Sequence, residues 1–148
     1  MELKPYQQQV INDLSLFLEQ VQETKDVKDA FYNFWATHPR TPLFPYAGTA
    51  IEPYKNNIER VPHICIKVPT AGGKTFIACN AIKTIFDAFD YDKAKAVVWL
   101  VPSITILDQT IKNLKDTSHP YRQKINSQFG NKVEVFDKAA LLQGSGFN

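Results

Sequence analysis

Apolar residues in the first part of the chain recur at the spacing of an α-helix. They stand at offsets of four, seven, eight and eleven from the first of them, which places them on one helical face. The residues of this face are Val10, Leu14, Phe17, Leu18 and Val21. Pro5 lies just before them and suits a first helical turn, where its missing N–H is no loss. A second helix is predicted from about residue 26 to 38, and we interpret its aromatic stripe as core packing.

Further along, short apolar runs alternate with helical patterns. The runs span residues 61–68, 96–101 and 132–136, and the helical patterns span residues 74–89, 104–114 and 138–143. Strands that alternate with helices form a parallel sheet with right-handed crossovers. The sequence therefore predicts an α/β fold with a parallel sheet, preceded by an N-terminal helical segment. The first run is apolar enough to predict a strand that is covered on both faces.

Residues 39–62 separate these two parts of the chain. Prolines interrupt them too often for regular structure, and their aromatic content is too high for a disordered segment. We interpret them as an ordered loop that lies across the domain surface. The predicted division is residues 1–60 for the N-terminal helices and this loop, and residues 61–148 for the first part of the α/β domain.

Composition narrows the class of protein only a little. The 148 residues are 44% hydrophobic and 22% charged, as in an ordinary folded domain. A net charge of +2 is too small to indicate a nucleic-acid partner by itself. Two cysteines, Cys65 and Cys79, give no disulfide framework, and we expect both thiols to be buried and reduced. No apolar run approaches the ~18 residues of a membrane span, so we expect a cytoplasmic protein.

The stretch from Val68 to Thr75 carries the clearest chemistry. An apolar run, a loop of small residues with Gly-Lys-Thr, and then a helix is the layout of a phosphate-binding loop. Small residues let several backbone N–H groups point at phosphate oxygens, and the helix start adds more. Val68 stands where the usual pattern has its first glycine, so the strict pattern fails and a plain glycine-rich turn is the alternative.

Three stretches together resemble the superfamily 2 helicases. Val68–Thr75 resembles their motif I, and Leu3-Lys-Pro-Tyr-Gln7 resembles the glutamine motif upstream of it. Trp99-Leu-Val-Pro-Ser103, with Gln109, resembles motif Ia. The subgroup that looks most similar is the helicase subunit of type III restriction enzymes, which the run Pro53–Asn56 also resembles. The resemblance implies an incomplete RecA-like three-layer sandwich, ATP and Mg²⁺ as cofactors, and DNA, most often duplex, as partner, with a methyltransferase or specificity subunit as a further partner.

The resemblance also implies roles for individual residues. Lys74 would bind the β- and γ-phosphates and Thr75 would hold Mg²⁺, which makes these two the catalytic candidates. The nucleotide-binding set is Lys4, Tyr6, Gln7, Thr70, Ala71, Gly72, Gly73, Lys74 and Thr75. Within it, Gln7 would contact the adenine edge, helped by Tyr6 or Lys4. Pro102 and Ser103 would meet the nucleic-acid backbone.

Two residues depart from the family pattern, and one motif is missing. Ala71 replaces a common glycine and disfavours positive φ, while Lys4 replaces the more usual arginine. No Asp-Glu pair follows Ser103, although hydrolysis needs an acidic group on magnesium. We therefore expect the N-terminal part of a longer ATP-dependent enzyme, which by itself does not turn over ATP. The alternatives are an RNA helicase, a nucleotide kinase, and a non-catalytic nucleotide-binding or assembly module.

Overall fold

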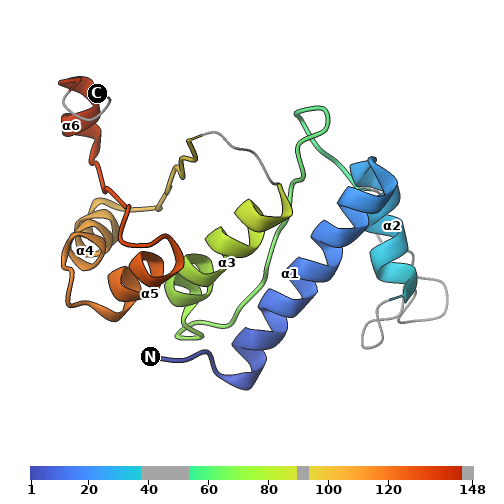
Figure 1. Ribbon diagram of the computed structural model, residues 1–148, viewed down its shortest axis with the longest axis horizontal. Helices are drawn as coiled ribbons and strands as arrows, with labels where there is room; N and C mark the ends of the chain where they lie inside the picture. Colours follow the sequence, from blue (N-terminus) through green and yellow to red (C-terminus); the bar gives the residue numbers. More distant parts are fainter. Residues whose placement is uncertain (38–53, 90–93, 145–148) are drawn as a thin grey trace.

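The computed structural model describes residues 1–37, 54–89 and 94–144, and these form six helices (Figure 1). The helices are α1 (Pro5–Thr24), α2 (Val27–Thr37), α3 (Lys74–Ala88), α4 (Ile104–Lys115), α5 (Pro120–Gln128) and α6 (Lys138–Leu142). α3 is the central element, since it packs on α1 on one side and on α5 on the other. α2 folds back onto α1, and α4 packs on α5. The helices expected from local periodicity are therefore present.

Local sequence sets the ends of the first two helices. Pro5 occupies the first turn of α1, as expected. Lys25 ends α1 in the left-handed conformation, with a φ of 58°. The Asp26 carboxylate then accepts the backbone N–H groups of Lys28 and Asp29, each at 2.9 Å, which satisfies the free donors at the start of α2.

Two apolar clusters hold the helices together. The first joins α1, α2 and α3 through Leu14, Phe17, Leu18, Val21, Val27, Ala30 and Ala81. The second joins α3, α4 and α5 through Cys79, Leu114 and Ile125. The aromatic residues of α2 pack against the first cluster, with Phe34 edge-on to Phe17, which agrees with the interpretation of that stripe as core. α3 thus contributes one residue to each cluster.

The predicted parallel sheet is wrong for the part of the chain that the structure describes. Residues 61–68, 96–101 and 132–136 form no strand there, and the fold is all-helical. In Figure 1 the chain of residues 54–70 runs on one side of α3, and the chain of residues 94–101 runs on the other. An apolar run indicates a need for burial, but a strand also requires hydrogen bonds from a neighbouring strand. The three runs form no such ladder.

Side-chain packing replaces the ladder only on one face of the second and third runs. Trp99, Val133 and Val135 pack against the cluster of α3, α4 and α5. The alternate residues Val98 and Leu100 are 82% and 87% exposed. The first run is less covered still, because Ile64 and Ile66 are each 43% exposed. The expectation of a strand covered on both faces is therefore also wrong.

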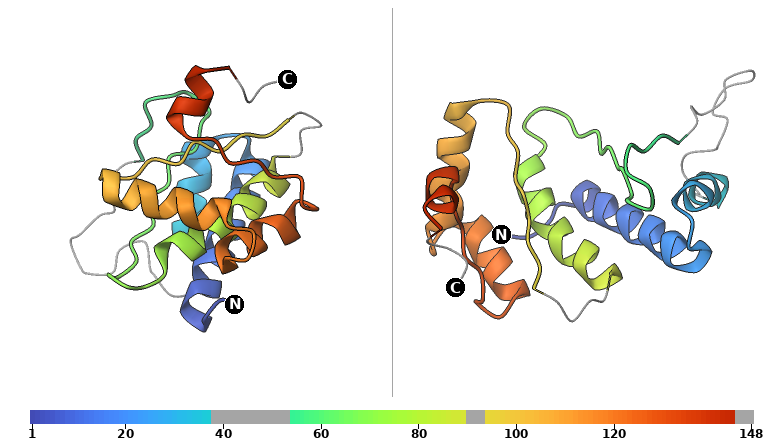
Figure 2. Two further views of the ribbon diagram at one scale, coloured as in Figure 1. Left: turned by 90° about the vertical axis from the view of Figure 1, so that its left-hand side faces the viewer. Right: turned by 90° about the horizontal axis from the view of Figure 1, so that it is seen from above.

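Arg122 on α5 fixes the return of the chain after α5. Its guanidinium donates to the carbonyls of Leu114 and Val133 at 2.8 and 2.7 Å, and to the Asn126 side chain at 2.8 Å. Five N–H donors in a planar fork suit one arginine to such a set of acceptors. Arg122 thereby connects α5 to α4 and to the segment that follows α5. Figure 2 shows this part of the fold from two further sides.

Two predictions from the sequence are not tested by the described residues. Most of the proline-rich loop, residues 39–53, lies outside the described residues. The domain division at residue 60 stays a prediction. Among the described residues, no helix combines the length and the apolar character that crossing a bilayer requires.

Candidate phosphate-binding site

The loop between residue 68 and α3 is a tight turn built on small residues. The Gly72 N–H donates to the Pro69 carbonyl at 3.0 Å, and Gly73 enters α3 with a φ of 73°. Ala71 has a φ of 61°, the conformation that its Cβ disfavours. A Cβ on Gly72 would stand 2.5 Å from Val68 Cγ1 and 2.9 Å from the Pro69 carbonyl oxygen. Position 72 therefore has no room for a side chain, and only glycine fits there.

The start of α1 holds this loop. The Tyr6 hydroxyl donates to the Gly72 carbonyl at 2.8 Å, and the Gln7 side-chain amide donates to the same oxygen at 3.0 Å. The Gln7 amide oxygen accepts the Lys4 N–H at 2.9 Å. Gln7 is only 5% exposed, and a Cβ on Gly73 would collide with its Nε2. Two stretches predicted to share one site thus meet directly in the structure.

The loop presents several unpaired donors. Within the described chain, the backbone N–H groups of Gly73, Lys74, Thr75 and Phe76 make no hydrogen bond, and α3 has no side-chain cap. These groups are the free donors of a helix start, where the positive end of the helix dipole also lies. The Lys74 ammonium group donates to the Pro69 carbonyl at 3.0 Å, and the side chain is exposed. The arrangement gives an anion several N–H donors and one mobile positive charge.

Thr75 provides a hydroxyl in the first turn of α3. No group of three or more His, Cys, Asp or Glu side chains in the described residues could hold a metal ion. Mg²⁺ bound with phosphates needs only one or two protein ligands and keeps several waters. Thr75 therefore fits a magnesium ion that is held mainly by a phosphate ligand, and does not fit a metal site made of protein alone.

α3 is anchored below the loop by buried residues. Cys79 is 0% exposed, and burial raises the pKa of its thiol from 9.0 to about 12. Phe76 and Ile77 are buried as well, and the Asn80 amide donates to the Phe76 carbonyl at 2.7 Å. The loop therefore sits on a fixed helix. Cys65, in contrast, is exposed, so the expectation that both thiols are buried is wrong for it because its segment is uncovered.

The second predicted contact point, Pro102–Ser103, precedes α4 and is exposed. The Ser103 hydroxyl accepts the Ile106 N–H at 3.3 Å, so Ser103 is the N-cap of α4. Ile104 is 77% exposed next to it. These residues make no long-range hydrogen bond within the described chain. The start of α4 is accessible to a partner at this position. Within the described chain, no hydrogen bond connects it to the phosphate loop.

The chain matches the family model of the type III restriction enzyme, res subunit, over residues 1–141. The chain belongs to this family. No curated protein and no solved structure shows a significant match to it. The resemblance to the restriction helicase subgroup is thereby confirmed at the level of the res-subunit family.

The res-subunit match spans both stretches that meet at Gly72, but it tests no single residue. The structure brings Tyr6, Gln7 and the loop together, with the Lys4 backbone beside them. Thr70 lies in the same turn and is exposed. The roles of these residues toward ATP, and of Pro102 and Ser103 toward nucleic acid, stay predictions.

One hollow in this res-subunit chain has the wrong charge for a nucleotide. It measures about 500 Å³ between α1 and α3 and is lined by Ser15, Glu19, Gln22, Glu23, Thr84, Asp87 and Ala88. Its three carboxylates repel phosphate. It also lies at the C-terminal end of α3, which is ~20 Å from the loop at 1.5 Å per residue. We therefore place the candidate site at the loop.

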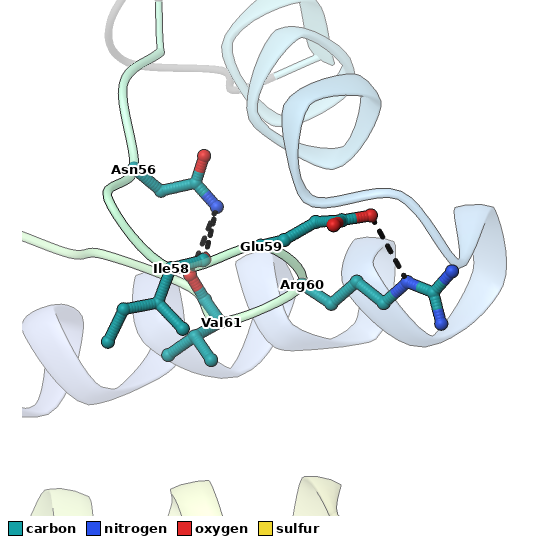
Figure 3. A network of polar contacts seen from close by, with 5 residues as sticks. All are labelled: Asn56, Ile58, Glu59, Arg60 and Val61. Atoms are coloured by element: carbon teal, nitrogen blue, oxygen red, sulfur yellow. Dashed lines mark hydrogen bonds and ion pairs between the residues drawn. The ribbon is translucent and has the colours of Figure 1, made fainter.

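The stretch before the first apolar run carries a separate turn. The Asn56 amide donates to the carbonyls of Ile58 and Val61, at 2.8 and 3.4 Å, and Arg60 has a φ of 62° (Figure 3). The Arg60–Glu59 ion pair at 3.7 Å is almost fully exposed, so it contributes little. None of these contacts reaches the phosphate-binding loop.

Sequence reasoning missed the contacts that organise the site. Pro69 accepts both the Gly72 N–H and the Lys74 ammonium group. The hydrogen bond from the Lys4 N–H to Gln7 could have been predicted locally. Gln7 is the third residue of α1, which is the glutamine position of a capping box. The bonds from Tyr6 and Gln7 to Gly72 span more than sixty residues of sequence, and no local pattern marks them.

Proposed function

We propose that this chain binds the phosphates of Mg-ATP at residues 70–76, as part of an ATP-dependent DNA helicase or translocase of a restriction system. The observation that carries the proposal is the set of free N–H groups at the start of α3, on a loop held by α1. Membership of the res-subunit family supports the helicase lineage. The more specific activity, ATP-driven DNA unwinding or translocation in a restriction system, rests on the resemblance of the three motifs.

Each residue has a defined task in this proposal. The N–H groups of residues 73–76 donate to phosphate oxygens, and Lys74 exchanges the Pro69 carbonyl for the terminal phosphates. Thr75 contributes its hydroxyl to Mg²⁺. When bound, the nucleotide supplies the phosphoanhydride bond whose cleavage drives a motor of this class. No Asp-Glu pair follows Ser103, so we propose that the 148 residues bind nucleotide without appreciable turnover.

Nucleotide binding tests the first part of the proposal. Lys74→Ala should weaken Mg-ATP binding to the 148-residue chain roughly 10- to 100-fold, since it removes a charge-assisted hydrogen bond. The control is Lys83→Ala, because Lys83 lies on the same helix, is partly exposed and pairs with Asp87. Equal binding by both variants contradicts the proposal. An ATPase rate that is robust in the wild-type chain and lost in Lys74→Ala contradicts the claim of no turnover.

DNA binding tests the second part. In the proposal, the start of α4 contacts the phosphate backbone without reading sequence. Ser103→Asp keeps a good N-cap but adds a negative charge, whereas Ser103→Asn keeps a good cap and stays neutral. The aspartate variant should weaken binding to a mixed-sequence DNA duplex and to an RNA duplex, and the asparagine variant should not. Equal binding by both variants contradicts this contact. The methyltransferase or specificity subunit stays a predicted partner.

A further inference from the structure

Two pairs of aromatic rings show how α5 lies against α3. At the N-terminal ends of the two helices, the Tyr121 ring stacks on the Phe76 ring, with centroids 5.9 Å apart and planes 25° apart. At the C-terminal ends, the Phe129 and Phe86 rings meet at a centroid distance of 5.9 Å. The two helices therefore run side by side in the same direction. α5 begins beside the end of α3 that carries the phosphate-binding loop (Figure 1).

The start of α5 is held by its own contacts. The Tyr121 N–H donates to His119 Nδ1 at 3.2 Å, which caps the helix, and the His119 ring packs edge-on against the Tyr121 ring at 4.6 Å. The next residue, Arg122, donates to the carbonyls of Leu114 and Val133. The first turn of α5 is thus tied to α4 and to the segment after α5, and it gives the Tyr121 ring a fixed position.

Phe76 links this fixed ring to the phosphate-binding loop. Its N–H is one of the groups of residues 73–76 that make no hydrogen bond within the described chain. Its side chain is only 3% exposed. The first turn of α3 lacks the stabilisation of an N-cap side chain, and helix ends without such partners fray readily. The stack with Tyr121 joins this turn to a helix whose start is capped.

We propose that Tyr121 is a positioning residue of the phosphate site. Its ring holds Phe76, and through Phe76 the first turn of α3, in the orientation in which the free N–H groups converge on a phosphate. The inference rests on the proposed phosphate binding. Donors that are already ordered bind more tightly, because the ligand does not have to order them. Tyr121 acts through Phe76 and does not contact the ligand, so it affects every ligand bound by its phosphates alike.

Two leucine variants of the 148-residue chain form a matched pair. Tyr121→Leu keeps an apolar side chain on α5 but removes the ring that stacks at the start of α3. Phe129→Leu removes the ring at the other end, against Phe86, which lies ~15 Å further along α3 at 1.5 Å per residue. Both variants should lower the melting temperature by a similar few degrees, since each loses one aromatic pair between the same two helices.

The dissociation constants of Mg-ATP and of inorganic tripolyphosphate with magnesium distinguish positioning from stability. Tyr121→Leu should raise both Kd values by one common factor, roughly 3- to 10-fold, because ordering of the first turn of α3 then opposes binding. Phe129→Leu should leave both Kd values unchanged. Tyr121→Phe keeps the stacked ring and should bind both ligands as the wild type does.

The outcomes separate this inference from the proposed function. Equal Kd changes in the two leucine variants, or none in Tyr121→Leu, with binding still lost in Lys74→Ala, overturn the inference alone. A loss of ATP affinity with tripolyphosphate affinity retained in Tyr121→Leu also overturns it, since Tyr121 would then contact the base. A wild-type chain that binds neither ligand overturns both proposals.

A second variant covers the case in which Tyr121→Leu does not fold. His119→Asn keeps a good N-cap for α5 but removes the ring that packs against Tyr121. It should raise both Kd values by one common factor that is smaller than for Tyr121→Leu. Unchanged Kd values in a folded His119→Asn chain would then overturn the inference.

Discussion

Two regions of the molecule share a local design and differ in their surroundings. Val68–Thr75 and Val101–Thr105 both connect an apolar run without strand pairing to the start of a helix. The first connection receives two hydrogen bonds from α1 on the Gly72 carbonyl. Within the described residues, the second has local hydrogen bonds alone, because the Ser103 hydroxyl accepts the Ile106 N–H and the Ser103 carbonyl accepts the Leu107 N–H. A local motif becomes an organised site when a distant part of the chain fixes its backbone.

The largest expected effect is at Gly73. Gly73→Ala should lower the free energy of unfolding by roughly 2–3 kcal/mol, since it adds left-handed strain and displaces Gln7. Gly130→Ala is the matched control, because Gly130 also has a positive φ, of 59°, but nothing lies within 4 Å of its added Cβ. It should cost only about 1 kcal/mol. Urea unfolding measures both, and equal losses would show that Gln7 does not constrain the loop.

A smaller effect is expected where the second connection is stabilised locally. Ser103→Ala should cost about 1 kcal/mol, which is typical for the loss of an N-cap, and Ser103→Asp should restore most of it. Mg-ATP affinity should stay the same in both variants, because the cap makes no contact with the phosphate loop. A change in ATP affinity in either variant would show that the two regions are coupled.

The anchoring of α3 gives a pH-dependent prediction. The pKa of Cys79 is raised from 9.0 to about 12 by burial, so the folded chain holds this proton more tightly than the unfolded chain. Its contribution is complete below pH 9 and is lost as pH rises from about 9 to about 12. Between pH 8 and pH 10 the wild type should lose about 1 kcal/mol more stability than Cys79→Ala. Parallel pH profiles of the two proteins would contradict this.

The smallest expected effect tests the strain in the loop. Ala71 adopts a φ of 61°, so Ala71→Gly should raise the free energy of unfolding by about 0.5 kcal/mol, the relief of strain less the entropy of the added glycine. Ala139→Gly, on the exposed side of α6, should instead lower it by up to ~1 kcal/mol. A loss of stability in Ala71→Gly would show that the left-handed conformation is not strained.

Local periodicity was sufficient to predict the helices of the described chain other than α5, whose polar sequence has no clear apolar face. The spacing of Val10, Leu14 and Val21 predicted α1, and the helical pattern of residues 104–114 predicted α4. Strands could not be predicted as reliably as helices, because a strand needs hydrogen bonds from a partner strand that local sequence does not specify. The apolar runs around Ile66 and Val98 are real, but the described chain leaves these side chains exposed.

The candidate site was predictable in its composition and not in its organisation. Gly72, Gly73 and Lys74 followed from the pattern of a phosphate loop. The attachment of Gln7 to Gly72 joins residues 65 positions apart, so only the folded chain reveals it. The sequence placed Gln7 toward a ligand, whereas the structure shows its amide engaged within the protein.

The central claim is that the start of α3 is a phosphate site. Backbone amide NMR shifts measured during titration with Mg-ATP test it most directly, because they report each N–H separately. We predict that the largest shifts fall on residues 73–76 and disappear in Lys74→Ala. Shifts concentrated instead on the acidic hollow between α1 and α3, or no shifts at saturating nucleotide, would contradict the claim.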